Sequence, residues 1–389
     1  MNEWKKVKLG DCISTKKGFA FKSALYTNCG VPVVRVSDFT LDSVADNDLV
    51  YYPHAEKDRY DEYVLNEGDV LIQTVGSWQY NPNSVVGKVV RVPYYHKGSL
   101  LNQNIVKIIP NNGYNNAFIF YRLKCRDFAG HVLGEARGAA NQASITLDTI
   151  KRFSFDCPLL STQQRIATIL SRYDSLIENY QKQIKLLEEA AQRLYKEWFI
   201  DLHFPGHENT NIIDGVPEGW EKKKVGDITP IITGKKDANF GTPDGEYPFF
   251  TCSQEPIKAP SFSFDCAAVL LAGNGDFNVK LYRGRFEAYQ RTYVLSPYID
   301  SHLYLLFYTI SANMTKLAAG SSGSTIKFLT KGMIDGINLN VPNDEILRSF
   351  NKKVEPIQSS RESLQSQLRL LTEARDRLLP KLMSGEITI

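Results

Sequence analysis

Six glycine-punctuated loops carry side chains of the kinds that read DNA. Amides and arginines make paired hydrogen bonds to adenine or guanine, whereas lysines suit phosphates. Such side chains gather in three loops of residues 1–158 and in three loops of residues 205–342. The candidate contacts in the first set are Lys16, Lys17, Phe19, Gln73, Thr74, Ser77, Trp78, Gln79, Tyr80, Arg137, Asn141 and Gln142. Those in the second set are Thr233, Lys235, Lys236, Asn274, Asn278, Ser321, Ser322 and Ser324.

No catalytic constellation accompanies these loops. Asn81–Ser84 lacks the second proline and the aromatic ring of an adenine methyltransferase N-P-P-aromatic loop. Gly273–Gly275 lacks G-x-G-x-x-G spacing, and Gly320–Thr325 lacks the lysine of a phosphate-binding loop. The six histidines show neither metal-ligand spacing nor a nucleophile–base pattern. The sequence therefore predicts no catalytic residue and no metal site.

Composition places the chain among ordinary globular proteins. Its 389 residues are 43% hydrophobic and 23% charged, which favours two or three domains. A net charge of +3 is too small to indicate a polyanionic partner by itself. No apolar run reaches about 18 residues, and the N-terminal segment lacks a signal-like stretch. We therefore expect a cytoplasmic protein without membrane contact, whose six scattered cysteines are reduced.

The chain contains an internal repeat. Trp4–Asp11 recurs as Trp220–Asp227, with every residue number raised by 216. Gln103 matches Gln290 at an offset of 187, and Pro158 matches Pro342 at 184, so the second copy is shorter. Such ordered long-period similarity predicts two related structural units.

Each copy ends in a strict heptad seam, with apolar residues spaced alternately by four and three. An apolar seam of this length must pack against another helix, and the helix of the other copy is the simplest partner because it carries a matching seam. The alternative is that each helix packs only on its own domain. The first seam comprises Ile166, Leu170, Tyr173, Ile177, Tyr180, Ile184, Leu187, Ala191, Leu194 and Trp198. The second comprises Phe350, Val354, Ile357, Arg361, Leu364, Leu368, Leu371, Arg375, Leu378 and Leu382.

Several residues punctuate these helices. Arg361 and Arg375 interrupt the second seam, and Pro356 should kink its helix or break the hydrogen-bond ladder of that helix. Ser161 with Gln164 fits a capping box at the first helix, and Asn343 or Asp344 can cap the second.

The globular parts are expected to contain both strands and helices. Strands are expected at residues 31–36, 69–73, 85–92 and 105–109, and short helices at 116–126 and 301–316. We therefore predict two α/β (mixed α+β) domains, 1–158 and 205–342. They alternate with long helices, 159–204 and 343–389, which pair as an antiparallel coiled coil around a pseudo-twofold axis. Trp4 and Trp220 open corresponding strands and are expected to be core anchors.

Over essentially its whole length the chain resembles the specificity subunit of type I restriction-modification systems. The resemblance lies in the ordered, twofold occurrence of motifs that are weak singly. They are the W-x(4)-[LV]-G-D start of each half, Gly68–Leu71, Asn102–Asn104, Pro158–Ile166 and Leu379–Ile387. The second copy departs from the pattern at Pro342–Ile346, which puts only the first turn of its helix in doubt.

The resemblance implies a DNA-binding subunit with two target recognition domains, each reading one half of a split double-stranded site. It implies that the helices set the spacing and dock two methyltransferase (M) subunits, which bind S-adenosylmethionine. Restriction (R) subunits would add ATP-driven translocation and cleavage. No cofactor is expected in this chain itself.

Two other functions remain open from the residues alone. A stand-alone DNA-modifying enzyme, a methyltransferase or nuclease, would require a cofactor loop and would bind S-adenosylmethionine. A coiled-coil scaffold protein would bind no DNA even with methyltransferase partners.

Overall fold

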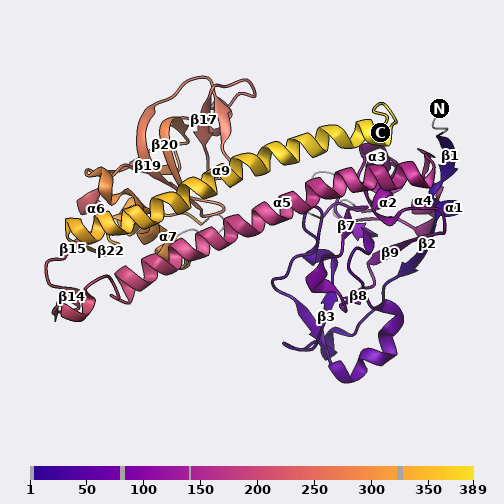
Figure 1. Cartoon of the computed structure of the whole chain (residues 1–389), viewed down its shortest axis with the longest axis horizontal. Coiled ribbons are helices and arrows are strands. Elements are labelled where there is room, and N and C mark those ends of the chain that lie inside the picture. The colour runs from indigo at the N-terminus through magenta and orange to yellow at the C-terminus, as the bar shows by residue number, and fades with distance from the viewer. Residues whose placement is uncertain (1–3, 79–83, 140–141, 322–326) are drawn as a thin grey trace. The chain divides into compact units, whose positions relative to one another are not determined.

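The computed structural model describes residues 4–78, 84–139, 142–321 and 327–389, and the chain divides into two compact units. Unit 1 comprises residues 1–179 and 367–389, and unit 2 comprises residues 180–366. Each unit therefore combines one globular part with a segment of each long helix (Figure 1). No helix in the described ranges is both long and apolar enough to cross a membrane.

Unit 1 is built on an antiparallel sheet in the order β2–β9–β5–β7. Its strands are β2 (Ile13–Lys17), β5 (Val70–Gln73), β7 (Val89–Arg91) and β9 (Ile105–Pro110). A two-stranded sheet pairs β1 (Lys5–Lys8) with β12 (Ser154–Cys157). A three-stranded sheet contains β3 (Val31–Val34), β4 (Val50–Tyr52) and β8 (Leu100–Leu101). Another contains β6 (Val75–Gly76), β10 (Arg137–Ala139) and β11 (Gln142–Ser144). The short helices are α1 (Leu9–Cys12), α2 (Asn116–Leu123), α3 (Arg126–Glu135) and α4 (Leu147–Arg152).

Unit 2 has a six-stranded sheet in the order β16–β21–β19–β20–β17–β18. Its strands are β16 (Ile231–Thr233), β17 (Tyr247–Phe250), β18 (Ile257–Ala259), β19 (Phe264–Ala272), β20 (Val279–Ala288) and β21 (Thr292–Leu295). Two further pairs are β13 (Ile212–Ile213) with β14 (Val216–Pro217) and β15 (Glu221–Lys224) with β22 (Asn338–Val341). The helices are α6 (Val225–Ile228), α7 (Leu303–Gly320) and α8 (Lys331–Asp335).

The strand registers reproduce the sequence repeat. Lys5 pairs with Cys157 in unit 1, and their repeat equivalents Glu221 and Val341 pair with each other in unit 2. The shortening of the second copy is also visible. Strands β7 and β8 are separate in unit 1, but the single strand β20 pairs with both β19 and β17. The mixed α+β fold class is confirmed, and strands and helices lie in every range where the sequence predicts them.

The long helices are α5 (Leu160–Tyr195), which continues into a π-helical turn at Lys196–Ile200, and α9 (Asp344–Met383). All twenty predicted seam positions are buried or half-buried. In unit 1, Ile166 and Leu170 share a core with Leu382. In unit 2, Trp198 shares a core with Phe350 and Val354. Because the start of α5 meets the end of α9, and its end meets the start of α9, the helices are antiparallel.

Three local predictions about these helices can be checked. Asn343 caps α9, since its side-chain oxygen accepts a hydrogen bond from the Ile346 amide at 3.0 Å. The capping box at Ser161 is wrong, because α5 already begins at Leu160 and the amides of residues 162 and 163 donate to the Leu159 carbonyl. At Pro356 helix α9 does not end but runs on to Met383, and the missing N–H of the proline takes one hydrogen bond out of its ladder. Val354 and Gln358, on either side of the proline, are buried.

The tryptophans that open the two copies support the cores. Trp220 is buried beside Phe199 and Phe204, with ring centroids 5.7 and 4.7 Å apart, and Trp4 packs against the core of unit 1.

A glycine is required at the same place in both units. A Cβ atom at Gly18 would lie 1.9 Å from the Asn102 carbonyl oxygen, and one at Gly234 would lie 1.9 Å from the Ala288 carbonyl oxygen. Both contacts are with backbone, which a rotamer change cannot relieve. These glycines allow the chain to turn away from β2 and β16 while pressed against a neighbouring segment.

Replacing Gly18 by alanine is expected to lower the free energy of unfolding by about 2–3 kcal/mol, because the backbone must shift to admit the methyl group. Gly130→Ala is the matched control, since a Cβ there meets nothing within 4 Å in the middle of α3. It should be neutral or stabilising by up to about 1 kcal/mol. Urea unfolding of the two variants measures the difference, and equal midpoints would show that the close approach is not tight.

Candidate nucleic-acid interface

Two of the predicted DNA-contacting loops of unit 1 bond to one backbone segment, Asn102–Ile105, which we call the hub, and the third bonds to the second loop. The Gly18 amide donates to the Ile105 carbonyl at 2.9 Å, and the Thr74 amide donates to the Asn104 carbonyl at 2.9 Å. The Ile145 amide, just after the third loop, donates to the Thr74 carbonyl at 2.9 Å. These bonds bring three loops that are far apart in sequence to one end of the central sheet.

The hub of unit 2 is Tyr289–Thr292, and the same three hydrogen bonds recur. The Gly234 amide donates to the Thr292 carbonyl at 3.1 Å, and the Gly273 amide donates to the Arg291 carbonyl at 2.8 Å. The Leu329 amide donates to the Gly273 carbonyl at 2.8 Å. The two acceptors of this hub are related to Ile105 and Asn104 by the same offset that relates Gln290 to Gln103. The repeat therefore preserves the geometry that positions the loops.

A small sheet fixes two of the unit 1 loops to each other. Strand β11 pairs with β6, so that Ala143 lies opposite Gly76 and Ser144 opposite Val75. The Trp78 indole N–H donates to the Ala139 carbonyl at 2.9 Å. The segment 73–78 and the paired strands 137–139 and 142–144 thus form one connected feature of the domain.

Three of the predicted contact residues hold this feature together from within. Gln73 is fully buried, and its amide donates to the Val75 and Ser84 carbonyls, both at 2.9 Å. The Thr74 hydroxyl donates to the Asn104 carbonyl at 3.0 Å, and the buried Ser77 hydroxyl lies 2.9 Å from that of Ser84. Their geometry supports a role in shaping the loop from inside.

Other unit 1 residues are better placed to meet a ligand. Lys17, Arg137 and Gln142 are exposed. Lys16 forms an ion pair with Glu62 and lies 4.4 Å from the centre of the Tyr63 ring. Phe19 belongs to an aromatic cluster with Phe21, Tyr60 and Tyr63, with ring centroids 4.9–5.3 Å apart, and so supports the domain.

The unit 2 candidates divide in the same way. Thr233 and Lys235 are exposed, whereas the Lys236 ammonium lies 4.3 Å from the centre of the Phe240 ring. Asn274 bridges to Phe328, and the Asn278 amide donates to the Cys252 carbonyl at 3.0 Å. Ser321 donates to the Ala318 carbonyl at 2.6 Å. The remaining candidates, Gln79, Tyr80, Asn141, Ser322 and Ser324, lie outside the described residues.

Sequence reasoning did not place the hub residues themselves in the site. Gln103 and Gln290 are exposed at equivalent positions, and Arg291 beside Gln290 is exposed as well. The signal was present, because the Gln103–Gln290 match is one of the repeat's landmarks and Asn102–Asn104 is one of its motifs. These residues were absent from the prediction because the hub is a turn between strands without glycine punctuation.

Two observations concern the metal-ligating side chains and the thiols. Within residues 4–78, 84–139, 142–321 and 327–389, no three His, Cys, Asp or Glu side chains are grouped as metal ligands. All six cysteines are unpaired thiols. Burial raises the pKa of Cys125 to about 11 and that of Cys157 to about 12, so both are neutral at physiological pH.

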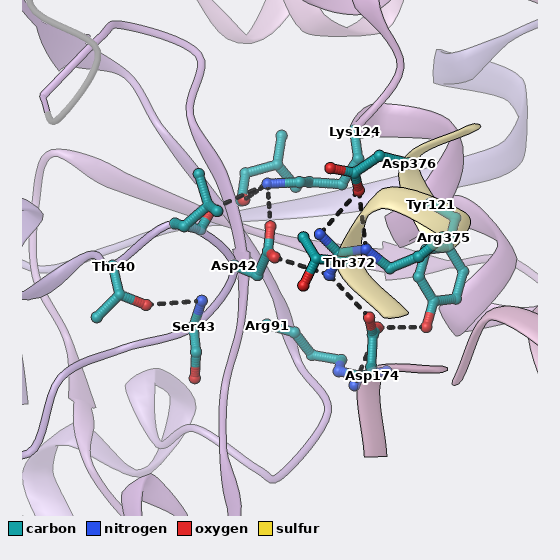
Figure 2. Close-up of polar contacts among 12 residues, drawn as sticks. Thr40, Asp42, Ser43, Arg91, Tyr121, Lys124, Asp174, Thr372, Arg375 and Asp376 are labelled. Atoms are coloured by element: carbon teal, nitrogen blue, oxygen red, sulfur yellow. Dashed lines mark hydrogen bonds and ion pairs between the residues drawn. The ribbon is translucent and has the colours of Figure 1, made fainter. Parts of the chain in front are cut away.

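A cluster of ion pairs joins the unit 1 domain to its two helix segments (Figure 2). At its centre, Arg375 of α9 lies 3.0 Å from Asp174 of α5 and 3.0 Å from Asp42 of the domain. Asp42 also pairs with Lys124 at 2.6 Å, and the Tyr121 hydroxyl donates to Asp174 at 2.5 Å. The domain is thereby fixed to both helices by directional contacts as well as by apolar packing.

These contacts shift the titration of their members. Burial alone would raise the pKa of Asp42, but Lys124 and Arg375 outweigh it and lower the pKa. Burial and the Asp174 carboxylate both raise the pKa of Tyr121, so its hydroxyl remains a donor. Burial alone would lower the pKa of Arg375, yet Asp42 and Asp174 raise it. At neutral pH the Asp42 carboxylate and the Arg375 guanidinium are therefore ionised, while the Tyr121 hydroxyl is neutral.

Comparison with known proteins yields one family throughout. Residues 1–189 and 217–360 match the family model described as type I restriction modification DNA specificity domain. The EcoDI specificity subunit of Escherichia coli is 36% identical over 177 residues, which cover 44% of this chain and 40% of that subunit. The MjaIX specificity subunit of Methanocaldococcus jannaschii is 27% identical over 319 residues, covering 74% of this chain and 73% of that subunit.

The fold has a counterpart among solved structures. A type I restriction-modification system S subunit from M. genitalium superposes with a TM-score of 0.64 at 16% identity, covering 98% of this chain and 96% of that one.

Because of the ion-pair cluster of Figure 2, the free energy of unfolding of unit 1 is expected to fall as the solution becomes acidic. Because folding lowers the pKa of Asp42, its contribution is complete above the unfolded carboxyl's pKa of about 4 and is lost as the pH falls through the lower folded value. Since this side chain is 29% exposed, we expect Asp42→Asn to cost only about 1–2 kcal/mol at pH 7 and less at pH 3. Urea unfolding at both pH values tests this.

Asp46→Asn provides the control, because Asp46 is an exposed neighbour outside the cluster. It should change stability by less than about 0.5 kcal/mol at either pH. A loss for Asp42→Asn that is as large at pH 3 as at pH 7 would show that the ionised form of Asp42 contributes nothing to the cluster.

Proposed function

Because the chain belongs to the family of type I restriction modification DNA specificity domains, we propose that each of its two globular domains reads one half of a bipartite site in double-stranded DNA. The hub of each domain presents the reading surface. The long helices α5 and α9 set the spacing between the two half-sites. The protein acts as the specificity subunit of a larger cytoplasmic complex.

The observation that carries this proposal is the repeated hub. Two domains that differ in length and loop sequence retain the same three backbone hydrogen bonds and place an exposed glutamine at the same point, Gln103 and Gln290. A glutamine amide can donate to one edge atom of adenine and accept from another, which distinguishes adenine from the other bases. Conserved geometry with divergent loops is what two readers of different half-sites require.

The exposed cations around each hub suit the DNA backbone. In unit 1, Lys17 precedes Gly18, which bonds to the hub, and Arg137 lies on β10 of the adjoining small sheet. In unit 2, Lys235 follows Gly234, which bonds to the hub, and Arg291 belongs to the hub itself. Lysine favours phosphate oxygens, while arginine binds either phosphate or guanine. Phosphate contacts would fix the position of each domain, and the amides would then select the sequence.

Two equivalent leucines support a role for the helices in docking the methyltransferase subunits. Leu186 of α5 and Leu370 of α9 are related by the offset of the helical repeat, and their exposed fractions are 53% and 54%. Both lie off the predicted seam. An apolar side chain exposed at the same place in both copies is suited to two copies of one partner.

Catalysis is assigned to partner subunits in this proposal. Methyltransferase subunits would bind S-adenosylmethionine and modify a base in each half-site, and restriction subunits would supply ATP-driven translocation and cleavage. The present chain would supply target choice and spacing. The lack of a catalytic or cofactor motif in its sequence supports this division.

Gln103→Ala and Gln290→Ala test the reading function. Each loses one base contact, so each should tolerate substitutions in one half-site only, with discrimination there falling roughly 5- to 150-fold. The measurement is genome-wide mapping of methylated positions for the complex assembled with each variant. If both variants relaxed the same half-site, or neither relaxed any, the hubs would not be the reading surfaces.

Leu186→Glu and Leu370→Glu test the docking function. Each should remove one methyltransferase subunit, and the double variant should remove both, because a carboxylate would be desolvated in an apolar contact. Subunit stoichiometry by native mass spectrometry gives the result. Leu25→Glu is the matched control, since Leu25 is 45% exposed and lies in a short turn of the unit 1 domain, Ser23–Leu25, outside both long helices. Unchanged stoichiometry in the double variant would exclude this docking surface.

A further inference from the structure

The two arginines that interrupt the apolar seam of α9 are not exposed to solvent. The side chains of Arg361 and Arg375 are 13% and 12% exposed. Each contacts an acid on α5: Arg375 lies 3.0 Å from Asp174 in unit 1, and Arg361 lies 3.5 Å from Glu188 in unit 2. The same sequence separation, two heptads, lies between the two arginines and between the two acids. Both ion pairs therefore belong to one antiparallel register.

The charges of the seam are divided unequally between the two copies. At the repeat offset of 184, Asp174 and Glu188 correspond to Gln358 and Thr372, while Arg361 and Arg375 correspond to Ile177 and Ala191. At these four repeat-related pairs of positions, the acids are therefore found on α5 alone and the arginines on α9 alone, because the equivalent residues of the other copy are uncharged. The apolar seam is thus nearly symmetric, but its ion pairs are not.

The neighbouring contacts show that this asymmetry is local. In unit 1 the Tyr121 hydroxyl donates to Asp174, and in unit 2 the Gln358 amide donates to the hydroxyl of Tyr308, the repeat equivalent of Tyr121. The tyrosine of each domain helix therefore contacts the same position of the long helix. Asp174 additionally accepts from Arg375 in unit 1, whereas Ala191 occupies the corresponding position in unit 2.

We propose that the Asp174–Arg375 and Glu188–Arg361 ion pairs form a pairing code that allows α5 to pair with α9 and prevents either helix from pairing with a second copy of itself. This inference rests on the proposed function. The code ensures that every assembled DNA-binding unit contains one recognition domain of each kind. The DNA site is then asymmetric, and assemblies that would read two identical half-sites are excluded.

Homotypic pairs through the same seam would remove the interhelical partners of these charges. Asp174 would keep Arg91 of its own domain, 3.8 Å away, and Arg375 would keep only the adjacent Asp376 of its own helix. In an antiparallel pair of two α9 helices, Arg375 would face Gln358 and Arg361 would face Thr372. In a pair of two α5 helices, Asp174 would face Ala191 and Glu188 would face Ile177. A charge that is taken out of water without an ionic partner strongly destabilises the pair that contains it. A single polar seam residue is known to select helix partners by this physics.

The two ion pairs do not contribute equally. Asp174 is 10% exposed and Glu188 is 41% exposed, so solvent screens the second pair more strongly. Arg361 also lies 5.9 Å from the centre of the Phe307 ring, and its Nε atom has no hydrogen-bond partner among the described residues. We therefore assign most of the discrimination to Asp174 and Arg375.

Charge exchange in the full-length chain tests the code. One double variant, Asp174→Arg with Glu188→Arg, makes all four positions basic, and a second, Arg361→Glu with Arg375→Glu, makes all four acidic. Either variant alone should show at least roughly a tenfold loss of soluble monomer. Co-expressed with different tags, the two should form a one-to-one complex of twice the chain mass, because α5 of each then matches α9 of the other.

The quadruple variant, which carries all four changes in one chain, should restore the monomer when Asp42→Asn is added, because an unchanged Asp42 would face the new carboxylate at position 375. Exchanging Arg369 and Glu373, an exposed pair on α9, is the matched control and should change nothing. Monomeric double variants with wild-type thermal stability, or co-expressed variants that do not associate, would overturn the code. Chain mass is measured without DNA, so this result stands apart from failure of the reading function in methylation mapping.

Discussion

The structure depends on the contact between two helices that are each amphipathic and each too long for one domain to cover. An apolar seam of ten positions is unstable in water, and the other seam offers a surface of matching periodicity. Antiparallel pairing follows, because the start of α5 shares its core with the end of α9 in unit 1 and the opposite ends meet in unit 2. Each domain completes its core on this pair: Phe118 and Phe128 of unit 1 pack with Leu170, and Trp220 of unit 2 packs with Phe350. The helices therefore organise both cores.

The recognition loops are likewise held in place by contacts with other parts of their domain. A loop that must vary in sequence cannot depend on its own side chains for its position, so its backbone has to be anchored elsewhere. The hub supplies this anchor through carbonyl oxygens, which every residue carries, and the Gly18 and Gly234 contacts bring the chain close enough to use them. Gln73, Thr74 and Ser77 complete the support in unit 1 from inside the domain. Side chains at the surface are then free to differ between the domains.

Much of this architecture follows from the sequence because periodicity and repetition report on packing. The heptad spacing predicts both helices and their pairing, and the twofold motif order predicts the two domains. The site is harder to predict, because hydroxyls and amides that support a loop have the same composition as those that read a base. Gln73 and Gln103 are the same residue type, yet one is fully buried and the other exposed. Pro356 and Ser161 show a related limit, since α9 continues past the proline and α5 begins one residue before the serine that is expected to cap it.

The seam also shows why a near-perfect repeat retains charged residues at buried positions. Apolar side chains at Arg361 and Arg375 would serve stability as well or better, because an ion pair taken out of water gains little over well-packed hydrocarbon. A fully apolar seam, however, would be the same in both copies, and each helix would then fit itself as well as its partner. Placing the acids on α5 and the arginines on α9 makes each helix fit its partner better than a copy of itself, while leaving the heptad register intact. Unit 1 uses its arginine twice, because Arg375 reaches Asp42 of the domain as well as Asp174 of the helix. Helix pairing and domain placement are therefore coupled through one guanidinium group.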